Sequence, residues 1–243
     1  MNPDTVLAPP QPLPPPRGFG HRLALLGIGI AVGVIILLLI VIGVVAVALD
    51  LDADSDTVLG ASLIGQGVAN FVILGLILMR ARRTGGALRD FGFRALNLGR
   101  AWWVVIAFVI AAYATIGLYD VAMDLAGLDS LRPESNIDDD LKDTTWIFIL
   151  AGVFAVLIAP LTEEMFFRGL VFSGFRRDFG LAVGLVASSL LFGLVHGQLT
   201  LILPFSLVGG YLALAYMYTR SLWGSIACHL TFNVLSFAAL ALS

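Results

Sequence analysis

The sequence is poor in charged residues and contains almost no cysteine or lysine. Only 13% of its 243 residues are charged, 59% are hydrophobic, and the mean hydropathy is +0.96. Soluble globular domains carry roughly 25% charged residues, so this composition excludes a soluble domain and indicates a polytopic membrane protein. The few basic residues also form no extended positive surface of the kind that binds nucleic acid.

Cys228 is the only cysteine, which excludes an intramolecular disulfide and a zinc site built from several thiolates. Lysine also occurs only once, and arginine supplies the other basic residues. This bias is typical of a protein from a high-GC bacterium.

Seven apolar segments approach or exceed the roughly 20 residues that a helix needs to cross a bilayer. They are residues 23–49, 57–79, 101–119, 146–175, 181–198, 203–219 and 222–243. The sequence therefore predicts an all-α transmembrane helix bundle of about seven spans, within a range of six to eight. The first segment is too long for a signal peptide and lacks a small-residue cleavage site, which predicts a retained span.

The charges between these segments alternate in sign. The loop after the second segment carries six arginines against one aspartate, whereas the loops after the first and third are acidic. The positive-inside rule predicts a protein of the plasma membrane whose arginine loop and N-terminus lie on the cytoplasmic side. We expect a disordered proline-rich tail (1–22), N-terminal transmembrane helices (23–119), an acidic extracytoplasmic loop (120–145) and a C-terminal transmembrane core (146–243).

Three ionisable residues interrupt the fourth apolar segment: Glu163, Glu164 and Arg168. Each costs about 2.5–3.5 kcal/mol at the centre of a membrane helix unless it is compensated. Glu164 and Arg168 are one turn apart and can form a salt bridge, whereas Glu163 points about 100° away. The alternative, a solvated helix end, is disfavoured because apolar residues continue to Phe175. Pro160 is expected to bend the helix.

Two of the three histidines fall within later apolar segments. His196 follows Phe192 by four residues, which places both on one helix face. His229 precedes Asn233 by the same spacing. Each polar side chain taken alone is more simply explained by an interhelical hydrogen bond. Counted at 1.5 Å per residue, however, Glu163 and both histidines reach the middle of a membrane core about 30 Å thick, which predicts that they meet around one cavity.

These residues resemble the CPBP family, the Abi-like group of intramembrane proteases that includes CAAX prenyl proteases and bacteriocin-processing proteins. The resemblance lies in three ordered motifs and covers roughly residues 145–243. The motifs are Glu163-Glu164-x-x-x-Arg168, Phe192-x-x-x-His196 and His229-x-x-x-Asn233. The resemblance implies that residues 146–243 form the catalytic core of an intramembrane endopeptidase.

The resemblance also implies roles for the motif residues. Glu163 and His196 would activate a water for attack on a peptide carbonyl, since burial makes a carboxylate a stronger base. His229 and Asn233 would donate hydrogen bonds to the oxyanion. The supporting residues would be Glu164, Arg168 and Phe192. Zinc held by Glu163, His196 and His229 is an alternative, but the His-Glu-x-x-His helix is missing, which favours metal-free chemistry.

Other polar residues in the spans have simpler explanations. Ser188 and Ser189 are expected to be packing residues. Gln66 and Asn70, one turn apart in the second segment, are expected to make an interhelical contact rather than to line a substrate path.

The sequence also leaves a second function open, that of a non-catalytic membrane protein with the same fold. Such a protein would be a transporter or a binding or immunity factor. No repeated half supports a transporter, and every motif residue is present, which favours the protease. Its expected partners are the lipid bilayer and a membrane-associated or lipid-proximal peptide, with no nucleic acid.

Overall fold

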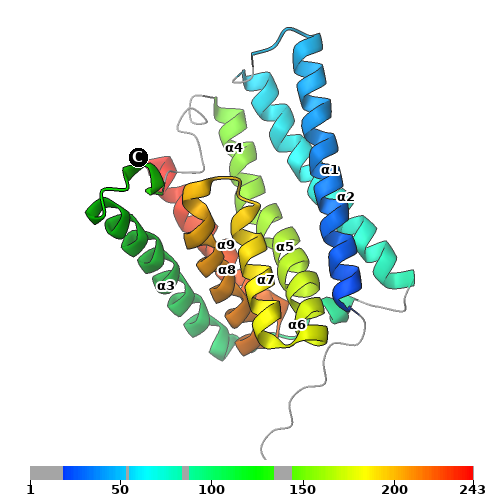
Figure 1. Ribbon diagram of the computed structural model, residues 1–243, viewed down its shortest axis with the longest axis vertical. Coiled ribbons are helices and arrows are strands. Elements are labelled where there is room, and N and C mark those ends of the chain that lie inside the picture. Colours follow the sequence, from blue (N-terminus) through cyan, green and yellow to red (C-terminus); the bar gives the residue numbers. More distant parts are fainter. Residues whose placement is uncertain (1–18, 53–54, 84–87, 134–143, 243) are drawn as a thin grey trace, which may run out of the picture.

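The computed structural model describes residues 19–52, 55–83, 88–133 and 144–242, which form a bundle of helices (Figure 1). Six helices among these residues are long and apolar enough to cross a membrane. They are α1 (His21–Ala48), α2 (Asp56–Arg83), α3 (Leu98–Leu125), the helical stretch Thr145–Phe179, α8 (Leu199–Thr219) and α9 (Leu222–Leu242). The predicted all-α polytopic fold is confirmed.

The fifth apolar segment differs from the expected span. Its helix, α7, covers only Leu181–Leu194, and 14 residues extend about 21 Å, less than a membrane core. The chain then reverses at Gly197, whose φ of 75° suits a residue without a side chain. His196 therefore lies in the turn between α7 and α8, not within a span. Helix α8 begins at Leu199, before the expected start at residue 203, and contains Pro204 in its interior.

The stretch Thr145–Phe179 is an α-helix with two π-helical interruptions. The α-helical parts are α4 (Thr145–Val153), α5 (Ala159–Glu164) and α6 (Ser173–Phe179). Wider π-helical turns join them at η4 (Phe154–Ile158) and η5 (Met165–Phe172). Pro160 lies in the first turn of α5 and lacks an N–H group, so the regular hydrogen-bond ladder cannot continue through it. Such π-helical turns are frequent at functional sites.

The predicted acidic loop at 120–145 begins later than expected. Helix α3 continues to Leu125 and is followed by the short helix η2 (Asp129–Leu131). Arg132 explains the extension, because its guanidinium binds Asp120 at 2.8 Å and Asp124 at 2.7 Å on the last turns of α3. The acidic residues at 138–140, like most of the tail at 1–22, lie outside the described residues.

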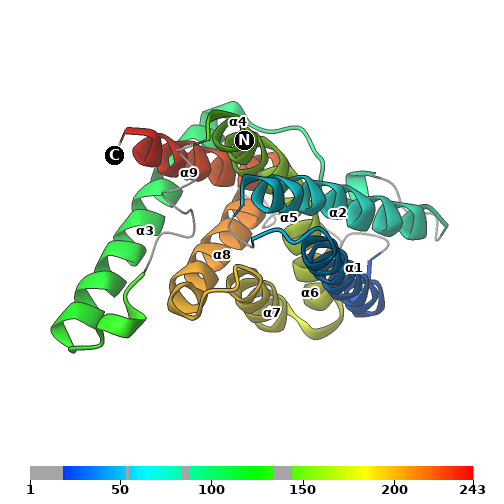
Figure 2. The same cartoon turned by 90° about the horizontal axis from the view of Figure 1, so that it is seen from above.

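The helix that carries the two glutamates lies in the middle of the bundle. Figure 2, seen from above, shows α5 between the α1–α2 pair on one side and α7, α8 and α9 on the other. Helix α5 packs against both α2 and α9, and α3 packs on the outside against α8 and α9. Side chains on α5 therefore face neighbours from both halves of the chain.

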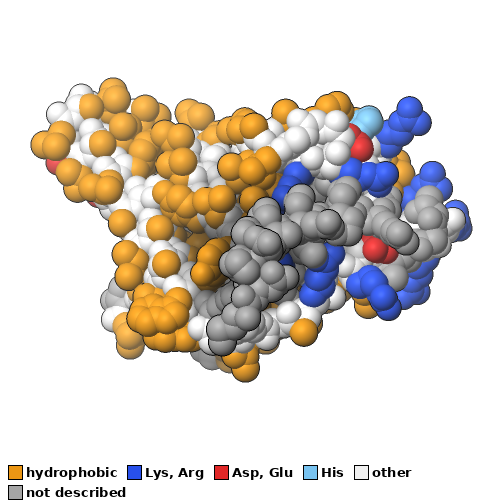
Figure 3. Space-filling model, turned by 90° about the horizontal axis from the view of Figure 1, so that it is seen from below, with side chains coloured by type: hydrophobic (Ala, Val, Ile, Leu, Met, Phe, Trp, Pro, Cys, Tyr) orange, Lys and Arg blue, Asp and Glu red, His pale blue; other side chains and the backbone are white. Residues whose placement is uncertain are grey.

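Basic side chains gather at one end of the bundle. The last turns of α2 and α6 carry Arg80, Arg82, Arg83, Arg176 and Arg177. The start of α1 joins them, because the backbone N–H of His21 donates to Asp178 of α6 at 2.7 Å. The view from below in Figure 3 shows arginine side chains clustered on one part of this face. The grouping agrees with the positive-inside expectation, while the membrane side itself stays a prediction.

Candidate active site

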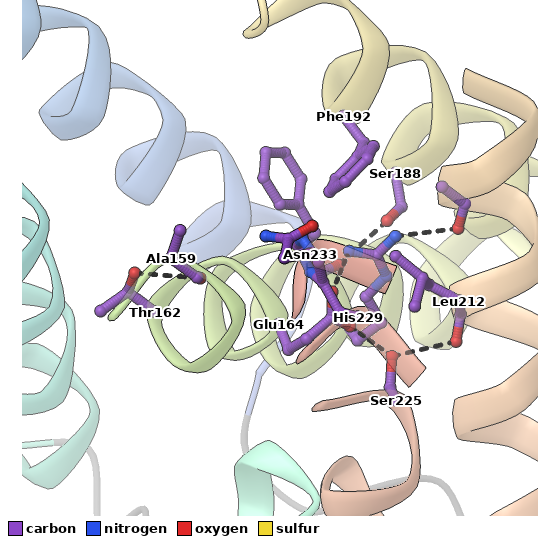
Figure 4. Close-up of polar contacts among 12 residues, drawn as sticks. Ala159, Thr162, Glu164, Ser188, Phe192, Leu212, Ser225, His229 and Asn233 are labelled. Atoms are coloured by element: carbon purple, nitrogen blue, oxygen red, sulfur yellow. Dashed lines mark hydrogen bonds and ion pairs between the residues drawn. The ribbon is translucent and has the colours of Figure 1, made fainter. Parts of the chain in front are cut away.

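Glu164 lies at the centre of a buried polar network (Figure 4). Its Oε1 atom accepts hydrogen bonds from Arg168 Nη1 at 2.7 Å and from His229 Nδ1 at 2.9 Å. Its Oε2 atom accepts from the hydroxyl of Ser225 on α9. The side chains of Glu164 and Arg168 are both 0% exposed. The predicted salt bridge is confirmed, and both oxygens of Glu164 are occupied by protein donors.

The guanidinium of Arg168 is held by more than its carboxylate partner. Its Nη2 atom donates to the carbonyl of Gly209 in α8 at 2.9 Å. The ring of Phe192 lies against the guanidinium, with 4.6 Å between the ring centroid and Cζ, a geometry in which aromatic rings attract cations. A buried ion pair needs such additional contacts to offset the loss of hydration of both charges.

Glu163, the neighbouring residue, is in a different environment. Its side chain is half-buried and lines two cavities, one on each side of α5. Its buried Oε2 atom has no hydrogen-bond partner among the described residues. Of the two adjacent carboxylates, one is thus bound by protein donors and the other faces open space.

His196 lines the same two cavities as Glu163, although it lies in the α7–α8 turn. Its Nδ1 atom lies 2.7 Å from the carbonyl oxygen of Phe192. Because a carbonyl only accepts hydrogen bonds, Nδ1 carries a proton, and the neutral ring presents Nε2 as an acceptor. Phe205 packs edge-on against the imidazole with 4.6 Å between centroids, which fixes its orientation.

His229 and Asn233 lie on α9 and face the cavity from the other side. With its Nδ1 atom directed at Glu164, His229 has only Nε2 for a further contact. The Nδ2 atom of Asn233 donates to the carbonyl of Ala155 at 2.6 Å, which uses one of its two N–H groups. Ala155 lies in the π-helical turn η4, where carbonyl groups depart from the regular ladder.

The cavity on the α9 side brings together all four residues that the sequence singled out as catalytic. Its volume is about 220 Å³. Its polar lining includes Glu163, His196, His229, Asn233 and Ser236, and most of the remaining lining is aromatic or aliphatic. The predicted convergence around one cavity agrees with this geometry, while the individual roles stay predictions.

Phe192 holds the two histidines apart and covers the ion pair. Its ring centroid lies 4.9 Å from that of His196 and 5.7 Å from that of His229, and the side chain is 2% exposed. Gly209 packs directly against it, so that no larger residue fits there without movement. A single aromatic side chain therefore lies between the two histidine rings and covers the guanidinium of Arg168.

Replacing Phe192 with alanine is expected to lower the free energy of unfolding by about 3–5 kcal/mol, the usual cost of emptying a buried aromatic site. Thermal unfolding of the purified protein measures this loss. Leu194→Ala is the matched control, because Leu194 is 52% exposed in the same helix and should cost less than about 1 kcal/mol. Equal effects of both substitutions would contradict the central position of Phe192.

The three residues considered for zinc do not converge on one point. Among the described residues, no group of three or more His, Cys, Asp or Glu side chains is arranged to hold a metal ion. The Nδ1 atom of His229 is directed at Glu164, and that of His196 at a backbone carbonyl. Because each ring keeps Nε2 free, these bonds alone do not exclude a zinc ligand. The described residues nevertheless lack the three-ligand group that a tetrahedral zinc site needs.

Other polar residues near the site have local partners. Thr162 donates to the carbonyl of Ile158 at 2.9 Å within its own helix, and Ser188 donates to the carbonyl of Phe167 at 3.1 Å. Ser188 therefore ties α7 to η5, in agreement with a packing role. Sequence reasoning missed Ser225, the third donor to Glu164, because its only signal was its position one turn before His229.

Comparison with known proteins gives two matches. Residues 145–235 match the family described as type II CAAX prenyl endopeptidase Rce1-like. The protein named "Putative membrane peptidase YdiL" of Bacillus subtilis (strain 168) is 24% identical over 131 residues, which cover 54% of this chain and 52% of that protein. The chain thus matches about half the length of this relative, and no solved structure matches. The family match coincides with the helices that carry the three motifs, and it supports the resemblance to the CPBP family.

Proposed function

We propose that this chain is an intramembrane endopeptidase that hydrolyses a peptide bond in a membrane-associated or lipid-proximal substrate. The observation that carries the proposal is the different environment of two adjacent carboxylates. Glu164 is bound by three protein donors, whereas Glu163 faces two cavities beside His196 with an unpartnered oxygen. The names of the matched family and of the relative, an endopeptidase and a membrane peptidase, support it.

In the proposed reaction, Glu163 takes a proton from a water molecule while the oxygen of that water attacks the peptide carbonyl carbon. The Nε2 atom of His196 accepts a hydrogen bond from the same water and holds it in place. The tetrahedral intermediate then collapses, the C–N bond breaks, and the proton passes from Glu163 to the leaving nitrogen. The products are a carboxylic acid and an amine, so a single water balances the reaction.

The oxyanion would form on the α9 side of this cavity. Asn233 contributes the N–H group that is not donated to Ala155. His229 donates from Nε2 only when the ring carries both protons, because Nδ1 donates to Glu164. The buried carboxylate of Glu164 stabilises that charged imidazolium. The network around Glu164 thus orients His229 for the reaction rather than touching the substrate itself.

The proposed enzyme lies in the plasma membrane with the arginine-rich end of the bundle on the cytoplasmic side. The six apolar helices support a multi-pass membrane protein, and the grouping of arginines at one end supports the orientation. Labelling of single cysteines placed at residues 84–87, applied from either side of intact cells, tests it.

The rival function is that of a non-catalytic binding or immunity factor or a transporter with this fold. Comparing the membrane proteomes of a deletion strain and a strain that carries only Glu163→Gln separates the two. A protease predicts that the same uncleaved precursors accumulate in both strains. A non-catalytic protein predicts that the Glu163→Gln strain resembles the wild type, an outcome that would overturn the proposed function.

Metal chelation is expected to leave the activity unchanged. The proposed reaction uses a carboxylate base, and the Glu and His side chains of the site are not arranged as metal ligands. Treatment of the purified protein with 1,10-phenanthroline, followed by dialysis and metal analysis, should leave the cleavage rate within about twofold. Loss of activity that added zinc restores would instead support the metalloprotease alternative.

A further inference from the structure

Two side-chain amides stand out on α2, an otherwise apolar helix. Gln66 Nε2 donates to Asn70 Oδ1 at 3.2 Å, one turn further along the same helix. Among the described residues, neither side chain makes a hydrogen bond to another helix, so the polar contact lies within α2. Gln66 is exposed and Asn70 is half-buried. The pair therefore contributes nothing polar to the packing of the bundle, which leaves its purpose open.

Both amides line the larger of the two cavities at the active site. This cavity has a volume of about 450 Å³ and lies between α1, α2 and the stretch Thr145–Phe179. Its lining is mainly apolar, and Glu163 and His196 form part of it. The amides and the proposed catalytic pair thus face one shared space, from opposite halves of the chain.

The position of α2 beside this cavity is set by a close helix contact. Gly67 follows Gln66 and packs against the ring of Phe154, and a side chain at Gly67 would collide with that ring. Phe154 belongs to the π-helical turn η4 and also lines the cavity. The neighbouring amide of Gln66 is therefore held at the cavity wall by a contact that leaves little freedom to α2.

The amides retain unused hydrogen-bonding groups. An Asn or Gln side chain has two N–H donors and one carbonyl acceptor, and the bond between the pair uses one donor of Gln66 and the carbonyl of Asn70. The Gln66 carbonyl and both N–H groups of Asn70 stay available. In apolar surroundings such groups favour a ligand that offers both donors and acceptors.

We propose that Gln66 and Asn70 bind the main chain of an extended peptide substrate that lies along this cavity. The inference rests on the proposed function. Residues four apart on a helix are separated by about 6 Å along its axis, and every second residue of an extended peptide repeats at about 6.6 Å. The two amides therefore match successive peptide groups on one edge of the substrate, while its apolar side chains contact the cavity wall.

This binding positions the peptide without taking part in the bond-breaking step. Glu163 and His196 lie on the same cavity, so a peptide held along α2 extends its next peptide group towards them. Interactions that are equal in the bound substrate and in the transition state raise KM when they are lost and leave kcat unchanged. The pair should also recognise the main chain and tolerate different side-chain sequences.

The test uses the full-length protein in nanodiscs and an equimolar library of quenched fluorogenic octapeptides with apolar residues at varied positions. Gln66→Met and Asn70→Leu keep the side-chain size and remove the amides. Each is expected to raise KM about five- to tenfold with kcat within twofold and an unchanged unfolding midpoint. Ser62→Ala is the matched control, because the Ser62 hydroxyl donates to the carbonyl of Val58 in its own helix. An unchanged KM in both amide variants overturns the proposal.

Two further measurements separate this inference from the proposed function. An ester in place of one substrate amide removes the N–H group that would donate to the Gln66 carbonyl. With that substrate, Gln66→Met should cause no further rise in KM. The Glu163→Gln protein is labelled with the same peptides carrying benzophenone. If the wild type cleaves no peptide, the proposed function fails. The binding site is still supported if the peptides label α2 and if Asn70→Leu weakens this labelling at least fivefold. Labelling that Asn70→Leu leaves unchanged overturns it.

Discussion

Replacing Glu163 with glutamine is expected to lower the rate of peptide hydrolysis at least about 100-fold, because a positioned general base contributes roughly 10²–10⁴. Glutamine keeps the shape of the side chain but cannot accept the proton of the attacking water. The buried Oε2 atom of Glu163 has no hydrogen-bond partner among the described residues, so the substitution removes no bond at that atom. The thermal unfolding midpoint should therefore change by less than about 3 °C.

Cleavage of fluorogenic peptides by the purified protein in nanodiscs measures the rate, and thermal unfolding of the same sample measures the fold. Asp129→Asn is the matched control, because it makes the same chemical change at an exposed carboxylate in η2. It should affect neither quantity. Full activity in folded Glu163→Gln would contradict the assignment of Glu163 as the base and, with it, the proposed reaction.

The different environments of the two glutamates were predictable from the sequence. A salt bridge between residues one turn apart needs only helical geometry, and it assigned Arg168 to Glu164. The expectation that Glu163 and the histidines meet rested on counting residues from the charged ends of each segment. The count assumes that membrane thickness fixes where a helix begins and ends, and the three side chains do line one cavity.

The position of His196 shows where this counting fails. The apolar residues of 181–198 have the composition of a span, but composition does not reveal that the helix ends at Leu194. The turn is made at Gly197 by its positive φ, and a single glycine in an apolar run is ordinary in membrane helices. His196 nevertheless keeps its contact with Phe192, since its imidazole bonds to the Phe192 carbonyl.

The contacts that join distant segments were beyond local reasoning. The bond from Asn233 to Ala155 depends on the π-helical turn η4, whose wider geometry has no sequence signal except the nearby Pro160. The hydrogen bond of Gln66 and Asn70 differs from the expectation for another reason. Statistics on membrane helices favoured an interhelical bond, but the contact at Gly67 directs α2 so that these amides face a cavity.

Replacing Glu164 with glutamine is expected to destabilise the protein by about 3–5 kcal/mol, the cost of removing one partner from a buried ion pair. Arg168 would keep its charge at 0% exposure, with only a neutral amide oxygen at position 164 and the carbonyl of Gly209 as acceptors. His229 would lose the carboxylate that orients it. For a chain of this size, the midpoint of thermal unfolding should fall on the order of 10 °C, in contrast to the adjacent Glu163→Gln.

The double variant Glu164→Gln with Arg168→Met distinguishes an uncompensated charge from lost packing. Methionine removes the charge and keeps much of the volume, so part of the lost stability, about 2 kcal/mol, should return. Activity should not return with it, because His229 still lacks its carboxylate partner. A double variant that is less stable than either single variant would mean that Arg168 contributes mainly through its contact with Phe192. Recovery of stability without activity would separate the two tasks of Glu164, which are to hold the bundle together and to orient His229.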